Sequence, residues 1–147
     1  MQFVSHPLQR EYDLLYKEMD DLYREIALRA GISNAAFSVL YALCDLGNGC
    51  LQKDICGRCY LSKQTVHSAV RKLESEGYLR MEPGRGRDVH LFLTQEGEAL
   101  ANRAVLPASQ AENRTLDAMS PSDRETLIRL TAQYVSLFKA ETRDLRP

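Results

Sequence analysis

The sequence lacks the features of a membrane-spanning or exported protein. No apolar run reaches the roughly 18 residues that a membrane span needs, and the first residues do not form a basic region followed by an apolar stretch. We therefore expect neither a signal peptide nor a membrane partner. With 147 residues, 44% hydrophobic and 27% charged, the composition suits a cytoplasmic globular chain of one domain, with or without helical extensions.

The chain also lacks a strong charge excess. Its net charge is −1 at pH 7, so the composition as a whole does not indicate a nucleic-acid partner. The charges are nevertheless unevenly distributed. Residues 50–90 contain eight Lys or Arg and five acids, whereas the flanking segments 1–49 and 91–147 are net negative. This basic middle favours one face directed toward phosphates.

Catalytic motifs are missing as well. The sequence has no Ser-His-Asp arrangement, no paired carboxylates and no phosphate-binding loop, and its histidines His6, His67 and His90 are scattered. An active site would need a nucleophile, a base and an electrophilic group in a recognisable arrangement. We therefore predict that the protein is not an enzyme and has neither catalytic residues nor a cofactor.

Four cysteines, Cys44, Cys50, Cys56 and Cys59, lie within sixteen residues. Cys56 and Cys59 form a CxxC pair, but no βαβ pattern surrounds it, as a thioredoxin-like motif requires. A zinc site needs a second ligand pair, and Cys44, Cys50 and His67 do not have the spacing of a zinc finger. Because a free cysteine packs as a small hydrophobic side chain, we predict structural thiols and no metal site. A redox switch and a metal site remain the alternatives.

Apolar residues recur every three or four positions in the first 30 residues, which predicts a long helix over residues 7–30 ending near Gly31. The stripe consists of Leu8, Tyr12, Leu15, Met19, Leu22 and Ile26. Such a stripe either packs within its own domain or forms a dimer seam. We favour the dimer seam, because a helix this long at the end of a small domain has little core to cover.

Further helices and two strands are predicted from capping residues and periodicity. Ser33 caps a helix over 34–46, a short helix follows over 51–58, and Ser62 caps a helix that runs to Glu76. Strands are expected over 78–82 and 88–93, joined by the Gly-rich turn 83–87. Helices then follow over 95–118, capped by Thr94 and expected to break or bend at Pro107, and from Ser120-Pro121 to about residue 143.

The helix after Ser62 has the polarity of a DNA recognition helix. An apolar stripe of Val66, Ala69, Val70 and Leu73 would face the core, and no acid occurs from Ser62 to Lys72. The helix N-terminus adds N–H donors for a phosphate, and the turn that follows contributes two arginines suited to phosphate or a narrow minor groove. The predicted DNA-binding residues are Ser62, Lys63, Gln64, Thr65, His67, Ser68, Arg71, Arg85 and Arg87.

Four segments, 51–55, 62–66, 71–79 and 93–97, resemble the winged helix-turn-helix of MarR-type regulators. The resemblance implies a mainly α (α+β) fold, a winged helix-turn-helix whose N- and C-terminal helices form a dimerisation region. It divides the chain into an N-terminal dimerisation helix at 1–32, a DNA-binding domain at 33–94 and C-terminal helices at 95–147. It further implies a homodimer on a pseudo-palindromic duplex, with half-sites about one helical turn apart.

Two details concern the wing and the effector. Arg87 matches the family's wing arginine, but Arg85 stands where the family often has an aspartate that holds it. Asp88 is the candidate to replace that aspartate. The resemblance also implies a cleft for a small aromatic effector. Its lining would include Tyr12, Tyr16, Phe37 and Tyr41, but we favour the interpretation that these residues belong to the core.

We thus predict a sequence-specific DNA-binding regulator, a repressor or an activator, modulated by a small molecule. One alternative is a winged-helix protein-interaction module without DNA binding, which need not retain Lys63, Gln64, Arg71 and Arg87 together. The other is an oxidant- or metal-responsive regulator based on the cysteines. Relatives that sense oxidants carry a cysteine near the start of the first helix, and this sequence has none there. The operator, the effector and the sign of regulation are not encoded in any pattern that we recognise.

Overall fold

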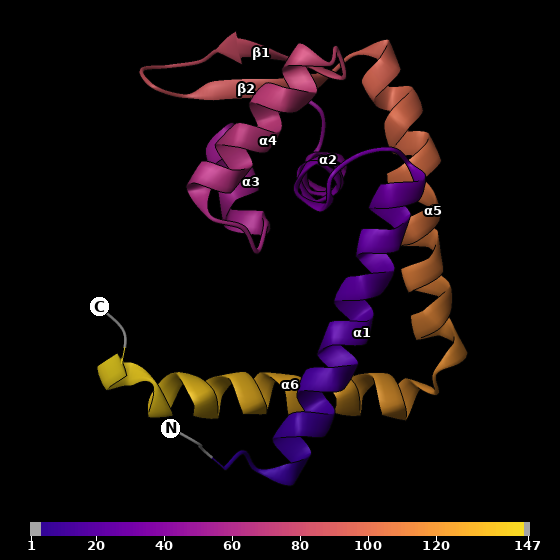
Figure 1. Cartoon of the computed structure of the whole chain (residues 1–147), viewed down its shortest axis with the longest axis vertical. Coiled ribbons are helices and arrows are strands. Elements are labelled where there is room, and N and C mark those ends of the chain that lie inside the picture. Colours follow the sequence, from indigo (N-terminus) through magenta and orange to yellow (C-terminus); the bar gives the residue numbers. More distant parts are fainter. Residues whose placement is uncertain (1–3, 146–147) are drawn as a thin grey trace. The chain divides into compact units, whose positions relative to one another are not determined.

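The computed structural model describes residues 4–145, which form helices, one two-stranded sheet and a terminal 3-10 turn (Figure 1). In chain order they are α1 (Pro7–Arg29), α2 (Asn34–Leu46), α3 (Gln52–Arg58), α4 (Lys63–Ser75), β1 (Leu79–Pro83), β2 (Val89–Leu93), α5 (Gln95–Ala118), α6 (Pro121–Glu141) and η1 (Arg143–Leu145). The predicted mainly helical fold with a two-stranded wing is confirmed. Contacts divide the chain into two units, which meet after Ala108 within α5.

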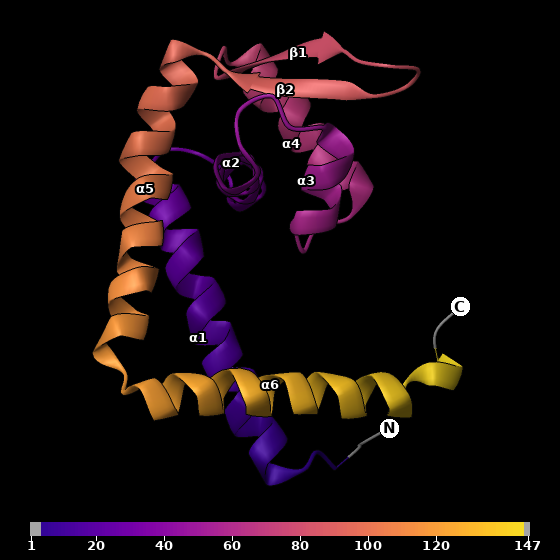
Figure 2. The same cartoon turned by 180° about the vertical axis from the view of Figure 1, so that it is seen from behind.

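The core of the first unit is built around α2, which lies between α4 and α5 in both views (Figures 1 and 2). Its apolar residues Phe37, Val39, Leu40 and Leu43 are buried, because α2 is surrounded by other elements. The apolar stripe predicted for α4 is confirmed, since all four members are buried: Val66, Ala69, Val70 and Leu73. Burial of one face leaves the opposite face of α4 in solvent.

The ends of α4 are fixed by local hydrogen bonds. The Ser62 hydroxyl oxygen accepts a hydrogen bond from the backbone N–H of Thr65 at 3.1 Å, as an N-cap does. At the other end Gly77 has a φ of +79°, a conformation that costs glycine little. This turn lets the N–H of Tyr78 donate to the Leu73 carbonyl at 2.9 Å, and the chain then enters β1.

The wing is the antiparallel pair β1–β2, in which Leu79 lies opposite Leu93 and Pro83 opposite Val89. A short segment before α3 pairs with the outer side of β2. The N–H of Gly49 donates to the Leu91 carbonyl at 2.8 Å, and the N–H of Leu91 donates to the Cys50 carbonyl at 3.0 Å. The base of the wing is therefore joined to the helices through backbone hydrogen bonds.

Helix α5 runs unbroken through Pro107, so of the break or bend expected there the break is wrong. A proline inside a helix loses one backbone hydrogen bond, but its fixed φ is compatible with helical geometry. Ala104, Val105 and Ala108 around it are buried in the first unit, and their packing favours a continuous helix. At its start the Thr94 hydroxyl oxygen accepts from the N–H of Gly97 at 3.0 Å, as predicted for a cap.

Two helices carry apolar faces that the described chain does not cover. On α1 the predicted stripe is exposed over its first five members, which are Leu8, Tyr12, Leu15, Met19 and Leu22, each between 43% and 66% exposed. In the second unit, α6 begins at the predicted Ser120 cap and has no buried residue. No single described helix is long and apolar enough to cross a membrane. Only α1 and α2 taken together, bent by 92°, pass that test of length and composition.

Candidate nucleic-acid interface

The solvent face of α4 carries six predicted contact residues, all of them exposed: Lys63, Gln64, Thr65, His67, Ser68 and Arg71. Acids enter only at the C-terminal end, where Glu74 pairs with Arg71 at 3.1 Å and Glu76 with Lys72 at 3.8 Å. Lys63, at the N-terminal end, has no ion pair with any residue of the described chain. The positive charge of this face is therefore least compensated where the helix N-terminus also exposes its N–H groups.

Ser62 and Thr65 already have partners in the free chain. Besides the cap, the Ser62 and Thr65 hydroxyls lie 2.8 Å apart and form a hydrogen bond. Ser62 therefore has a structural role that is independent of any ligand, because it fixes the start of α4. Either hydroxyl retains lone pairs and can bond to a phosphate or a base edge through its remaining capacity.

The wing tip presents Arg85 and Arg87 in solvent. The turn is closed by its own backbone, since the N–H of Gly84 donates to the Asp88 carbonyl at 2.8 Å. The expectation that Asp88 holds Arg87 is wrong. The Asp88 carboxylate instead takes both of its hydrogen bonds from Lys53 Nζ on α3, at 2.9 and 3.0 Å. Within residues 4–145 neither wing arginine forms an ion pair, so both remain available to a polyanion.

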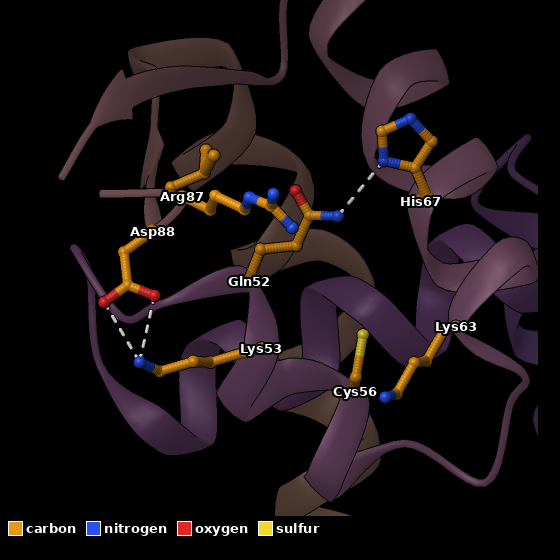
Figure 3. Close-up of a pocket in the computed structure, with 8 residues that line it drawn as sticks. Gln52, Lys53, Cys56, Lys63, His67, Arg87 and Asp88 are labelled. Atoms are coloured by element: carbon orange, nitrogen blue, oxygen red, sulfur yellow. Dashed lines mark hydrogen bonds and ion pairs between the residues drawn. The ribbon is translucent and has the colours of Figure 1, made fainter. Parts of the chain in front are cut away.

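A hollow of about 530 Å³ lies where α3, the start of α4 and the wing meet (Figure 3). It is lined by Gln52, Lys53, Cys56, Lys63, His67, Arg87, Asp88 and Val89. The structure thus brings together three of the predicted residues, Lys63, His67 and Arg87, from two elements that are far apart in sequence. Three of the lining residues are cations, Lys53, Lys63 and Arg87, and one lining residue, Asp88, carries a carboxylate. This charge balance suits an anion larger than a single ion, such as a stretch of nucleic-acid backbone.

Gln52 and Lys53 were missed by the sequence analysis. The Gln52 amide nitrogen lies 3.3 Å from His67 Nδ1, so it links the first turn of α3 to the solvent face of α4 (Figure 3). The available signal was their position, because in a helix-turn-helix the helix before the recognition helix crosses the nucleic-acid backbone. Polar residues at the start of α3 were therefore candidates for phosphate contact.

The four cysteines are free thiols. Burial raises the pKa of Cys44 and of Cys59, and burial together with Asp54 raises the pKa of Cys50. The Cys59 thiol also donates to the Ser38 carbonyl at 3.4 Å. Raised thiol pKa values disfavour the reactive thiolate, which supports structural roles for these three thiols. Within the described part of the chain no three His, Cys, Asp or Glu side chains are placed to hold a metal ion.

The four aromatic residues proposed for an effector cleft differ in their surroundings. Phe37 is 2% exposed, and its ring lies 6.1 Å from that of Tyr41 and 6.3 Å from that of Tyr23. Tyr12 and Tyr16 lie on α1 and are exposed. The core interpretation favoured from the sequence is therefore confirmed for Phe37 and wrong for Tyr12 and Tyr16.

With this geometry established, comparison with known proteins identifies the family. Residues 30–88, which span α2 to the wing turn, match the model of the MarR family. These residues, which include the helix-turn-helix and most of the wing, belong to the MarR family. MarR proteins are DNA-binding transcriptional regulators and not enzymes, which agrees with both expectations from the sequence. A search of curated proteins gave no significant match.

Solved structures with the same fold cover nearly the whole chain. BpsR of Bordetella bronchiseptica, whose DNA binding is regulated by 6-hydroxynicotinic acid, is 22% identical with a TM-score of 0.67, covering 91% of this chain and 98% of its own. MepR of S. aureus, in complex with DNA, is 20% identical with a TM-score of 0.71, covering 90% and 99%. Sco3205 of Streptomyces coelicolor, also in complex with DNA, is 17% identical with a TM-score of 0.74, covering 92% and 89%. At these identities the similarity shows the shared fold.

Proposed function

We propose that this MarR protein acts as a cytoplasmic homodimer that binds a pseudo-palindromic operator and is modulated by a small molecule. The observation that carries the proposal is the exposed, acid-free N-terminal face of α4, together with two wing arginines that form no ion pair within residues 4–145. In this arrangement α4 enters the major groove and Gln64, Thr65 and Ser68 meet base edges. Lys63, His67, Arg71, Arg85 and Arg87 contact phosphates or the minor groove.

The proposed dimer covers the apolar faces of the terminal helices. On α6 seven large apolar side chains are at least 37% exposed: Leu127, Ile128, Leu130, Tyr134, Val135, Leu137 and Phe138. Together with the exposed stripe of α1, they form more apolar surface than a soluble monomer normally leaves uncovered. We assign dimerisation to residues 1–32 and 95–147, and DNA binding to residues 33–94. Two copies of α4 then address half-sites about one helical turn apart.

The small-molecule part of the proposal is motivated by BpsR, which responds to a hydroxylated aromatic acid. In this chain Tyr12, Tyr16, Tyr23 and Tyr41 are aromatic side chains of α1 and α2 that remain at least partly accessible, and the buried ring of Phe37 lies near those of Tyr23 and Tyr41. An aromatic effector stacked on these rings would gain apolar contact and a phenolic hydrogen-bonding partner. We propose a compound of that chemical class.

Selection from a pool of random duplexes at low salt tests the DNA-binding proposal. We expect recovery of a two-fold symmetric site, with affinity that falls steeply as salt rises. Sedimentation of the protein alone should show a dimer. Arg87→Ala should weaken binding to the recovered site, whereas Arg103→Ala, which removes an exposed cation of α5 outside the interface, should not. Recovery of no symmetric site at low salt would favour the protein-interaction module instead.

A further inference from the structure

The Lys53–Asp88 ion pair is unlike the other ion pairs between residues 4 and 145, because it joins the wing to the helices. The remaining pairs lie within one helix, within β1, between helices or at the start of α6. Here Lys53 on α3 meets a residue 35 positions later in the chain. Both carboxylate oxygens of Asp88 are used, and its side chain is 32% exposed.

The wing is attached to the rest of the unit along β2, from Leu93 as far as His90. There the N–H of Leu93 donates to the Asn48 side chain at 2.8 Å, and His90 Nδ1 lies 2.8 Å from the Gly49 carbonyl. Beyond Val89 the tip is held by its own turn, which Asp88 closes through its backbone. The Asp88 carboxylate is therefore the attachment nearest to the tip. Because Arg87 directly precedes Asp88, whatever fixes Asp88 also fixes the backbone from which Arg87 extends.

An acid at this place is unexpected for a surface that binds a polyanion. Asp88 is the one carboxylate among the lining residues of the hollow, beside Lys53, Lys63 and Arg87 (Figure 3). By charge alone it repels phosphates and compensates one of the cations. The ion pair with Lys53 gives this carboxylate a role that can outweigh the repulsion.

We propose that the Lys53–Asp88 pair is a clamp that holds the wing against α3, so that Arg87 faces the same hollow as Lys63 and His67. Asp88 is then a positioning residue for sequence-selective binding rather than a DNA contact. The predicted effect of the clamp on DNA binding rests on the proposed function. The attachment of the wing to α3 concerns the free protein. The two effects change different quantities in Asp88→Asn. Loss of repulsion strengthens binding to every duplex, whereas loss of the clamp lowers the preference for the selected site.

The structural part is tested without DNA, by amide hydrogen exchange of the wing tip in the full-length protein. Asp88→Asn should speed exchange of the Gly84 N–H by about two- to fivefold, as expected for loss of a partly exposed ion pair. Asp45→Asn is the matched control, since it removes an acid that pairs with Arg58 of α3 at 2.6 Å, away from the wing. It makes the same change in net charge and should leave wing exchange as it is. Unchanged exchange at Gly84 in Asp88→Asn overturns the clamp.

A charge swap separates pairing from net charge. Lys53→Asp and Asp88→Lys each place like charges opposite one another and should speed wing exchange, while the double variant restores an attractive pair at the original net charge. We expect the double variant to recover the protection of Gly84 and the ratio of affinities for the selected and an unrelated duplex. If protection returns but no variant binds a selected duplex, the clamp stands and the proposed function fails. If the double variant exchanges as fast as the single variants, the clamp is wrong.

Discussion

Replacing Gly97 by alanine would place a Cβ atom on the backbone of Tyr78, the residue just before β1. An added Cβ overlaps the carbonyl oxygen of Tyr78, lies 2.9 Å from the carbon of that carbonyl and lies 3.2 Å from the Leu93 side chain. A neighbouring side chain could rotate away from such a contact, but a backbone carbonyl cannot. Relief requires the first turn of α5 to move away from the wing.

That movement breaks a specific set of contacts. The N–H of Thr94 donates to the same Tyr78 carbonyl at 3.1 Å, and the Thr94 hydroxyl donates to the Gly77 carbonyl at 2.6 Å. Losing or stretching these hydrogen bonds costs about 1 kcal/mol each, and residual overpacking adds about 1–3 kcal/mol. The better helix propensity of alanine offsets about 1 kcal/mol. We therefore expect Gly97→Ala to lower the free energy of unfolding by about 2–4 kcal/mol.

Gly57→Ala is the matched control, because Gly57 is also helical and an added Cβ there meets nothing within 4 Å. This variant should be more stable than the wild type, by about 0.5–1 kcal/mol from helix propensity alone. Both variants are compared by urea unfolding followed by circular dichroism, at equal protein concentration because the proposed dimerisation would shift the midpoint. If Gly97→Ala is as stable as Gly57→Ala, the start of α5 does not approach the Tyr78 carbonyl as closely as the structure indicates.

Further predictions concern the interface, the cap and the thiols. Arg87→Ala should weaken binding to all duplexes and lower the salt slope by about one, whereas Gln64→Ala should relax the preference at particular bases by about 1–3 kcal/mol, as titrations of base-substituted sites would show. Ser62→Ala removes the cap of α4 and should lower the free energy of unfolding by about 1 kcal/mol in urea, while Ser62→Asn should retain most of it. The raised pKa of Cys59 means that the folded chain keeps the neutral thiol. Stability is then constant below the ordinary thiol pKa and declines as pH rises past it, and mild oxidation at neutral pH should change neither duplex affinity nor the number of titratable thiols. A fall in affinity on oxidation would favour the redox alternative.

The elements of the fold follow from local sequence to a large extent. The buried stripe of α4 was predictable because Val66, Ala69, Val70 and Leu73 repeat at the helical period, and Ser62 marks the start of the helix by its side-chain chemistry. The failure at Pro107 has a different origin. A local rule predicts a break, but the burial of neighbouring alanines in the first unit outweighs the loss of one hydrogen bond.

The candidate site was predictable only in part, because periodicity determines which residues face solvent but not which solvent-facing residues meet. Lys63, His67 and Arg87 were identified from their types and faces, whereas the meeting of Lys53 with Asp88 depends on where the hairpin ends relative to α3. That position is determined by hydrogen bonds at the base of the wing, such as Gly49 to Leu91, which join segments about 40 residues apart. No local pattern contains this information.

The ion pairs of the free chain also rank the predicted contacts, which sequence alone treats as equal cations. Arg71 must leave Glu74 before it can serve a phosphate fully, and such an exposed pair is worth about 0.2–1 kcal/mol. Arg87 and Lys63 form no ion pair among residues 4–145, so neither has to break one before it attracts an incoming polyanion. Lys53 lies at the other extreme, since its charge is already used to hold the wing. The cations of this surface therefore fall into two groups: Lys63 and Arg87 are available to contact a polyanion, and Lys53 supports the wing. Asp88, the one carboxylate that lines the hollow, causes this division because it pairs with Lys53.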